Sequence, residues 1–79
     1  MVLPAALEHL VRGIVDNPDD VRVDLVHGRR GKVLEVRVHP EDLGKVIGRG
    51  GRTAKALRQV VTGIGGRGVR VDVVETDQR

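Results

Sequence analysis

"VIGRGGRTAKAL", residues 46–57, is the stretch that decides the fold, because it joins two segments of helical pattern through a run of glycine and arginine. Residues 48–52 alone hold three glycines and two arginines. Glycine at this density costs backbone entropy on folding, so its presence needs a physical reason. Two reasons are available: the glycines permit a tight turn between helices, or they let a ligand approach the backbone.

The surroundings of this glycine run favour contact with an anionic ligand. A tight link between helices leaves N–H groups at the start of the second helix without partners, and helix N-termini attract phosphate. Arg49, Arg52 and Lys55 add positive charge, while glycine removes side-chain bulk that would hold a sugar-phosphate backbone away. Because Gly51 alone would be enough for a turn, we predict that residues 48–52 contact a ligand.

A second glycine cluster, "GIGGRG" at residues 63–68, has the G-x-G-x-x-G spacing of dinucleotide-binding loops. That loop needs a strand before it and a helix after it, whereas the opposite order is predicted here. We interpret this cluster as a helix C-cap and a turn into a strand. A Walker loop is excluded too, because Gly44-Lys45 is followed by Val46 and not by a magnesium-binding Ser or Thr.

Composition predicts one small domain over residues 1–79, with its core at about 3–75 and a frayed tail at 76–79. The chain has no Cys and no aromatic residue, so neither a disulfide nor a thiolate metal site is available. Its net charge of +3 is uneven: residues 29–58 hold nine basic and three acidic side chains, whereas residues 1–28 hold two and five. This basic middle segment favours an anionic partner.

Hydrophobic periodicity predicts the element order α-β-β-α-α-β. The predicted segments are a helix at 4–15, strands at 21–27 and 32–39, a short helix opening at Pro40, a helix at 53–62 and a strand at 69–74. The turn "GRRG" gives the first two strands a basic hairpin tip. This order predicts an α+β fold in which one three-stranded sheet carries three helices on one face.

The other face of the sheet is predicted to present charges of both signs. Its outward side chains include Arg22, Asp24, Glu35, Arg37, Arg70 and Asp72. Because the two signs are balanced, we expect these side chains to form cross-strand pairs in water and to bind no ligand.

No catalytic, metal or membrane-spanning feature is predicted. The side-chain hydroxyls are those of Thr53, Thr62 and Thr76. The histidines, His9, His27 and His39, lie on separate elements with no carboxylate cluster at metal spacing, so we expect neither an enzyme nor a cofactor. No apolar run approaches the ~20 residues of a membrane span, and no signal-peptide pattern is visible, so we expect a cytoplasmic protein.

The string "VIGRGGRTAKAL" resembles the V-I-G-x-x-G-[KR] signature of the KH domain, with Gly48-Arg49-Gly50-Gly51 as the GxxG loop. KH domains clamp about four single-stranded nucleotides with this loop. The resemblance covers about residues 3–75, and the element order is similar to the bacterial type II arrangement with a mixed sheet. The chain most resembles the small single-KH RNA-binding proteins of the KhpA (YlqC) family, which partner a Jag/KhpB/EloR-type RNA-binding protein.

The residues and the resemblance together imply an RNA-binding set. Its members are Lys45, Val46, Ile47, Gly48, Arg49, Gly50, Gly51, Arg52 and Lys55. Ile47 is expected in the floor of a base groove, whose far side the family lines with the strand before the loop, here 32–39. Val36 and Val38 are candidates for that floor, with a place in the core as the alternative.

Two positions depart from the family pattern. Ala54 stands where many KH domains have a larger aliphatic residue, which implies a more open helix face. Gly50 leaves Arg49 as the only base between the paired glycines, which implies weaker binding and a more flexible loop. Base stacking on aromatic side chains, worth about 1–3 kcal/mol per base, is also lacking. We therefore expect weak, loosely sequence-specific binding of single-stranded RNA, strengthened by a second RNA-binding unit in a homodimer or a hetero-partner.

The expected role is that of a post-transcriptional regulator or RNA chaperone that acts with a partner. The alternative is a protein-interaction or dimerisation module in which RNA binding is secondary. Val26, Val33 and Val74 on the outward sheet face, together with Ala54 on a helix, are the apolar positions that such a module would use.

Overall fold

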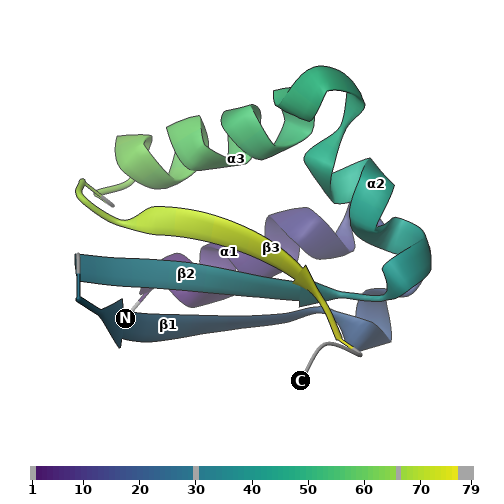
Figure 1. Cartoon of the computed structure of the whole chain (residues 1–79), viewed down its shortest axis with the longest axis horizontal. Helices are drawn as coiled ribbons and strands as arrows, with labels where there is room; N and C mark the ends of the chain where they lie inside the picture. Colours follow the sequence, from purple (N-terminus) through teal and green to yellow (C-terminus); the bar gives the residue numbers. More distant parts are fainter. Residues whose placement is uncertain (1, 30, 66, 77–79) are drawn as a thin grey trace.

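The computed structural model describes residues 2–29, 31–65 and 67–76, and it confirms the element order α-β-β-α-α-β (Figure 1). Its main elements are α1 (Val2–Arg12), β1 (Arg22–Gly28), β2 (Gly31–Val38), α2 (Leu43–Ile47), α3 (Arg52–Gly63) and β3 (Arg70–Glu75). Short 3-10 turns occupy Pro18–Asp20, Pro40–Asp42 and Arg49–Gly51. Arg30 of the predicted hairpin tip, Gly66 of the second glycine cluster and residues 77–79 of the predicted tail lie outside the described residues.

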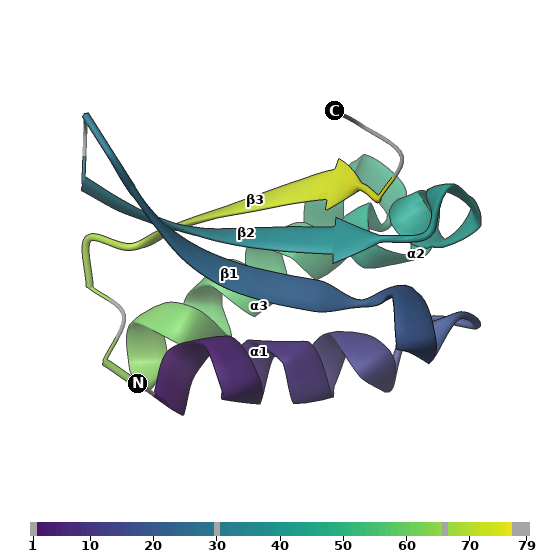
Figure 2. The same cartoon turned by 90° about the horizontal axis from the view of Figure 1, so that it is seen from below.

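The strands form one mixed sheet in the order β1-β2-β3. β1 and β2 make an antiparallel hairpin, and β3 lies parallel to β2, with Leu34 opposite Val71 and Val36 opposite Val73. The helices lie on one side of this sheet, and the other side is open (Figure 2). The predicted α+β fold, with a three-stranded mixed sheet and helices on one face, is therefore confirmed.

The core lies between the sheet and the helices, and strand alternation builds the sheet's share of it. Leu34, Val36 and Val38 on β2 are fully buried, while the residues between them are partly exposed. The other buried apolar side chains are Leu3, Leu7, Val11, Val21, Val46, Ala54, Leu57, Val61 and Val71. β2 thus runs through the middle of the fold, with its inward side chains away from solvent.

Each of the two long helices ends at or next to a glycine. α1 stops at Arg12, three residues before the predicted end, and the N–H of Gly13 donates to the carbonyls of His9 and Leu10. α3 ends at Gly63, and the N–H of Ile64 closes its last turn on Val60 at 3.1 Å. The second glycine cluster therefore forms a helix end and a turn into β3, as predicted.

The charges on the open sheet face contradict the prediction of cross-strand pairs. The register places Arg22 opposite Arg37, Asp24 opposite Glu35, and Glu35 opposite Asp72, so the opposed charges have the same sign. Along the chain, the basic residue comes before the acidic one on β1 and after it on β2. Because the two strands run antiparallel, side chains of the same charge lie opposite each other. Arg37 instead pairs with Glu35 along β2, at 2.7 Å.

The chain beyond β3 remains attached to the sheet at the first residue of the predicted tail. The N–H of Thr76 donates to the carbonyl of Val38 at 2.8 Å. This hydrogen bond ties the first residue of the predicted tail to the end of β2. Within the described ranges, no helix combines the length and apolar character that crossing a membrane requires.

Candidate nucleic-acid interface

Residues 48–51 join α2 to α3 through a sharp backbone turn. Gly48, Gly50 and Gly51 have φ angles of 77°, 63° and 78°, a region that L side chains rarely adopt. Backbone conformation alone therefore favours glycine at all three positions, not only at Gly51 as the sequence reasoning assumed. The density of glycine is thus explained by the turn itself, without a ligand.

Those surroundings differ among the three glycines. A Cβ on Gly48 would lie 2.8 Å from the backbone N of Thr53, so the first turn of α3 packs directly against this glycine. A Cβ on Gly50 or Gly51 would meet nothing within 4 Å. The loop is thus closed at Gly48, where it holds the two helices together, and open at Gly50 and Gly51.

A groove of about 570 Å³ begins at the open side of the loop and lies between α3 and β3. Its lining consists of Ile47, Gly50, Gly51, Ala54, Lys55, Arg58, Val71, Asp72 and Val73. An adjoining hollow shares Arg58, Val71 and Asp72 with it and adds Thr62, Val69 and Arg70. The concave surface therefore continues from the glycine loop along α3 and β3 to the beginning of β3.

Four residues of the predicted set line this groove: Ile47, Gly50, Gly51 and Lys55. Ile47 keeps 37% of its surface exposed, which makes it available as an apolar floor. Gly48, Arg49 and Arg52 belong to the adjacent turn and helix start, and both arginines are exposed. Ala54 also lines the groove, although only 7% of its surface is exposed.

One further member of the predicted set, Val46, and both candidates for the groove floor, Val36 and Val38, are buried in the core. Val36, Val38 and Val46 each have 0% of their surface exposed, and none of them lines the groove. The structure therefore favours the alternative of a core role for Val36 and Val38. The strand beside the groove is β3, which follows the loop, and not the strand predicted at 32–39. β2 is the central strand of the sheet, whereas β3 lies at its edge beside α3.

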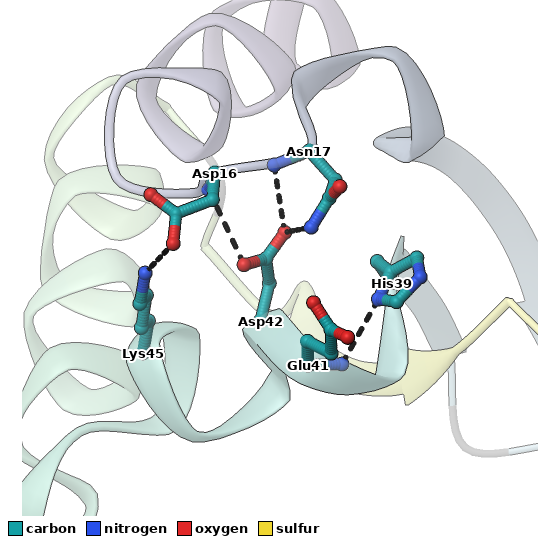
Figure 3. Close-up of polar contacts among 6 residues, drawn as sticks. All are labelled: Asp16, Asn17, His39, Glu41, Asp42 and Lys45. Atoms are coloured by element: carbon teal, nitrogen blue, oxygen red, sulfur yellow. Dashed lines mark hydrogen bonds and ion pairs between the residues drawn. The ribbon is translucent and has the colours of Figure 1, made fainter.

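Lys45 points away from the groove. Its Nζ forms an ion pair with the carboxylate of Asp16, in the connection between α1 and β1 (Figure 3). The hydrogen bond from Lys45 to Asp16 raises the pKa of Lys45, and nearby carboxylates, including Asp42 and Glu41, add to this against the cost of desolvation. Lys45 thus joins the cluster around Asp42, not the lining of the groove.

Asp42 is a buried carboxylate whose role the sequence reasoning missed. Its oxygens accept hydrogen bonds from the backbone N–H groups of Asp16 at 3.2 Å and Asn17 at 2.9 Å, and from the Asn17 side chain (Figure 3). Burial would raise the pKa of Asp42, but these hydrogen bonds and the charge of Lys45 outweigh it and hold the pKa below its ordinary value. Asp42 therefore anchors the start of α2 to the α1–β1 connection.

The groove is positively charged on its α3 side. Arg49, Arg52, Lys55 and Arg58 are exposed, and within residues 2–29, 31–65 and 67–76 none of them forms an ion pair. Arg58 was not among the predicted residues, although its position three residues after Lys55 on a helix signals that the two side chains share a face. A groove with an apolar floor, two cations in its lining (Lys55 and Arg58) and two more at the adjacent loop (Arg49 and Arg52) suits a flexible polyanion that carries flat apolar groups.

The comparisons with known proteins agree with this geometry. A family model described as the KH domain of KhpA and KhpB matches residues 4–76, which places the chain in the class of KH-domain proteins. The chain belongs to the KhpA/KhpB KH-domain family.

Curated relatives cover almost the whole chain. One, "RNA-binding protein KhpA" of Mycobacterium tuberculosis (strain ATCC 25618 / H37Rv), is 77% identical over 77 residues, which are 98% of this chain and 96% of the relative. A protein of the same name in Streptomyces coelicolor is 74% identical over 76 residues, 96% of each chain. Another in Halalkalibacterium halodurans is 47% identical over 72 residues, 87% of this chain and 95% of the relative. No solved structure matches the chain significantly.

Proposed function

We propose that this chain binds single-stranded RNA in the groove between α3 and β3, with residues 48–51 against the sugar-phosphate backbone. The observation that carries the proposal is the open space at Gly50 and Gly51 beside the exposed cations Arg49, Arg52, Lys55 and Arg58. Phosphate can approach the backbone of the loop at these two glycines, and the basic side chains neutralise its charge. The names of the relatives support RNA as the ligand.

The bases lie on an aliphatic floor in this proposal. Ile47, Val71 and Val73 supply apolar surface at the groove, and the chain has no aromatic side chain on which a base could stack. β3 has only one neighbour in the sheet, so its other edge offers backbone N–H and C=O groups for hydrogen bonds to bases. Without stacking worth about 1–3 kcal/mol per base, binding by one copy is weak and depends little on sequence.

The experiment that tests this proposal compares two double variants of the loop. Asp at positions 50 and 51 (Gly50→Asp/Gly51→Asp) places carboxylates where phosphate would lie, so affinity for a labelled single-stranded RNA falls at least about tenfold. Asn at the same positions (Gly50→Asn/Gly51→Asn) has the same shape and tolerates a positive φ, so it controls for strain. Fluorescence anisotropy gives the affinities, and circular dichroism confirms that both variants are folded.

Two results would refute the RNA proposal. One is equal RNA affinity for the Asp variant and the wild type. The other is a plot of log K against log salt concentration with a slope near zero, because each neutralised phosphate of a single strand contributes about −0.7 to that slope.

We further propose that the chain acts as a post-transcriptional regulator or RNA chaperone and not as an enzyme, with a second RNA-binding unit that raises its apparent affinity. That unit is a second copy or a Jag/KhpB/EloR-type protein, and the family that joins KhpA with KhpB supports the latter. Since RNA is available in the cytoplasm, we place the activity there.

The alternative of an interaction module has less support from the open sheet face. Val26 is opposite Val33, but Val74 lies two rows away opposite Arg37, with acidic side chains between them. Ala54 is buried and does not extend this surface. Sedimentation of the RNA-free protein, together with RNA recovery from lysate by wild type and the Asp loop variant, separates the two roles. A dimer that recovers no RNA supports the interaction module.

A further inference from the structure

A second concentration of positive charge lies at the hairpin end of the sheet, away from the glycine loop. Arg29 and Lys32 flank the turn between β1 and β2, and Arg67 lies in the connection that leads from α3 to β3. All three side chains are exposed, and in the described part of the chain none of them forms an ion pair. We call these three residues the basic end.

Two contacts hold the parts of the basic end together. A Cβ on Gly31, in the hairpin, would lie 3.8 Å from the carbonyl oxygen of Gly68, so the α3–β3 connection runs beside the hairpin turn. In the sheet register, Val33 is opposite Arg70 at the beginning of β3. The hairpin turn and the α3–β3 connection, which are more than 30 residues apart in sequence, therefore lie at the same end of the molecule (Figure 1).

The groove leads to this surface. Its continuation is lined by Thr62 of α3, by Val69 and by Arg70 at the start of β3, and Arg67 lies two residues before Val69 in the chain. Arg58, in the middle of the groove, lines both of its parts. The basic side chains of α3, Arg52, Lys55 and Arg58, thus lie in its first seven residues, roughly 10 Å of helix from the glycine loop. Beyond them, Arg70 in the lining of the adjoining hollow continues the positive charge toward the basic end.

The acidic groups nearby define the direction from which a polyanion can arrive. Asp72 lines the groove, and it continues a row with Asp24 and Glu35 across the open face of the sheet. This row repels phosphate on the open face. The path with favourable charge therefore runs along α3 and its connection to β3, and not across the sheet.

We propose that the basic end is a second phosphate-binding surface, which takes the RNA strand after it leaves the groove. The proposal rests on the function proposed above and adds a longer footprint to it. A loop of the GxxG kind holds about four nucleotides, so a longer strand has to continue past one end of the groove. The basic end contacts only the backbone of this continuation, so it adds affinity without adding sequence preference.

The test measures how affinity depends on the length of the RNA. A four-nucleotide oligomer is compared with two twelve-nucleotide oligomers that extend it at the 5′ or the 3′ end with the same uracil tract. Wild type is expected to bind one of the two long oligomers about tenfold more tightly than the short one. In Arg29→Gln/Lys32→Gln this gain falls to less than about threefold, and the salt slope for that oligomer falls by about 1.4, or 0.7 for each lost phosphate contact.

A matched variant removes the same charge elsewhere. Arg12→Gln/Arg22→Gln lowers the net charge by two on α1 and at the far end of β1, and it is expected to keep the length-dependent gain. Circular dichroism checks that both variants fold. The proposal is overturned if wild type binds short and long oligomers equally, or if both variants lose the gain equally, which is the result expected from net charge alone. Loss of four-nucleotide binding in the hairpin variant would overturn it as well.

These outcomes are separate from a failure of the function proposed above. If the Asp loop variant keeps its affinity for the four-nucleotide oligomer, the loop is not the RNA site. The dependence of affinity on RNA length and on the basic end is measured in proteins with an intact loop. Its result is therefore independent of the result for the Asp loop variant.

Discussion

Asp42 and Asn17, 25 residues apart in sequence, share two hydrogen bonds: a carboxylate oxygen of Asp42 accepts from the backbone N–H of Asn17 at 2.9 Å and from its Nδ2 at 3.0 Å. The other carboxylate oxygen accepts from the backbone N–H of Asp16. Since Asp42 directly precedes α2, this contact fixes the helix that leads into the glycine loop. Asp42 does not line the groove, but it anchors the helix that leads into the glycine loop and so helps to position the groove.

Replacing this carboxylate is expected to destabilise the fold. In Asp42→Asn an amide NH₂ replaces one acceptor oxygen, so a donor faces a donor in a buried position. The Tm falls by roughly 5 °C or more in thermal unfolding followed by circular dichroism. Asp19→Asn, a change at an exposed carboxylate in the Pro18–Asp20 turn, is the control and is expected to leave the Tm unchanged.

The same carboxylate makes stability depend on acid. Because the pKa of Asp42 in the folded protein lies below its ordinary value of 3.8, the stability that the carboxylate contributes is fully present above that pH. It is lost as the pH falls from there through the lower, folded-state pKa. The difference in Tm between wild type and Asp42→Asn is therefore expected to be constant near neutral pH and to shrink below about pH 4. A constant difference across that range would contradict the pKa direction.

Four glycines should respond differently to alanine. Gly48→Ala combines a positive φ with a collision against the backbone of Thr53, and it should cost roughly 2–5 kcal/mol of unfolding free energy. Gly50→Ala and Gly51→Ala have a positive φ but open space, so about 1–2 kcal/mol is expected. Gly44→Ala, in α2 with open space, should gain up to about 1 kcal/mol. Urea unfolding measures all four, and equal losses at Gly48 and Gly50 would contradict the packing against Thr53.

Core and groove residues can be told apart by two substitutions. Val36→Ala removes a fully buried side chain and should cost about 2–3 kcal/mol of stability, while RNA affinity below the melting transition stays unchanged. Ile47→Ala removes a partly exposed side chain at the groove, so it should cost less than about 1 kcal/mol and lower RNA affinity several-fold. If Val36→Ala lowered RNA affinity and Ile47→Ala did not, the RNA would contact β2 and not Ile47.

The row of acids on the open sheet face predicts a stabilising substitution. Asp24→Asn removes a negative charge directly opposite Glu35, so stability should rise by a few tenths of a kcal/mol at low salt. In 1 M salt the gain should vanish, because the Debye length is then only about 3 Å. Asp20→Asn, in the Pro18–Asp20 turn, is the control, and an equal gain there would point to net charge and not to the register.

The sequence contained most of the fold, because periodicity and turn chemistry act locally. Alternation in residues 32–39 and the glycines after each helix were enough to predict the element order. The order of the strands within the sheet could not be predicted from these local patterns. With β2 taken as the strand beside the groove, Val36 and Val38 became candidate ligand contacts, whereas the parallel pairing of β3 puts them at the centre of the sheet.

The candidate site was predictable where the loop itself forms it. Ile47, Gly50, Gly51 and Lys55 follow from the string of residues 46–57, and they line the groove. Lys45 directly precedes this string but pairs with Asp16, 29 residues away. Such a contact depends on how the α1–β1 connection packs against α2, which no local pattern reports. Asp42 was missed for the same reason.

The parallel pairing of β2 with β3 also has a consequence for the order of folding. The chain between these strands contains α2, the glycine loop and α3, so all three belong to the crossover that must close before β3 can pair. One wall of the groove therefore forms only when this closure is complete. A ligand that fills the groove binds the closed state alone, and by mass action it holds β3 against the sheet. In this protein, occupancy of the groove and the pairing of β3 are therefore linked equilibria.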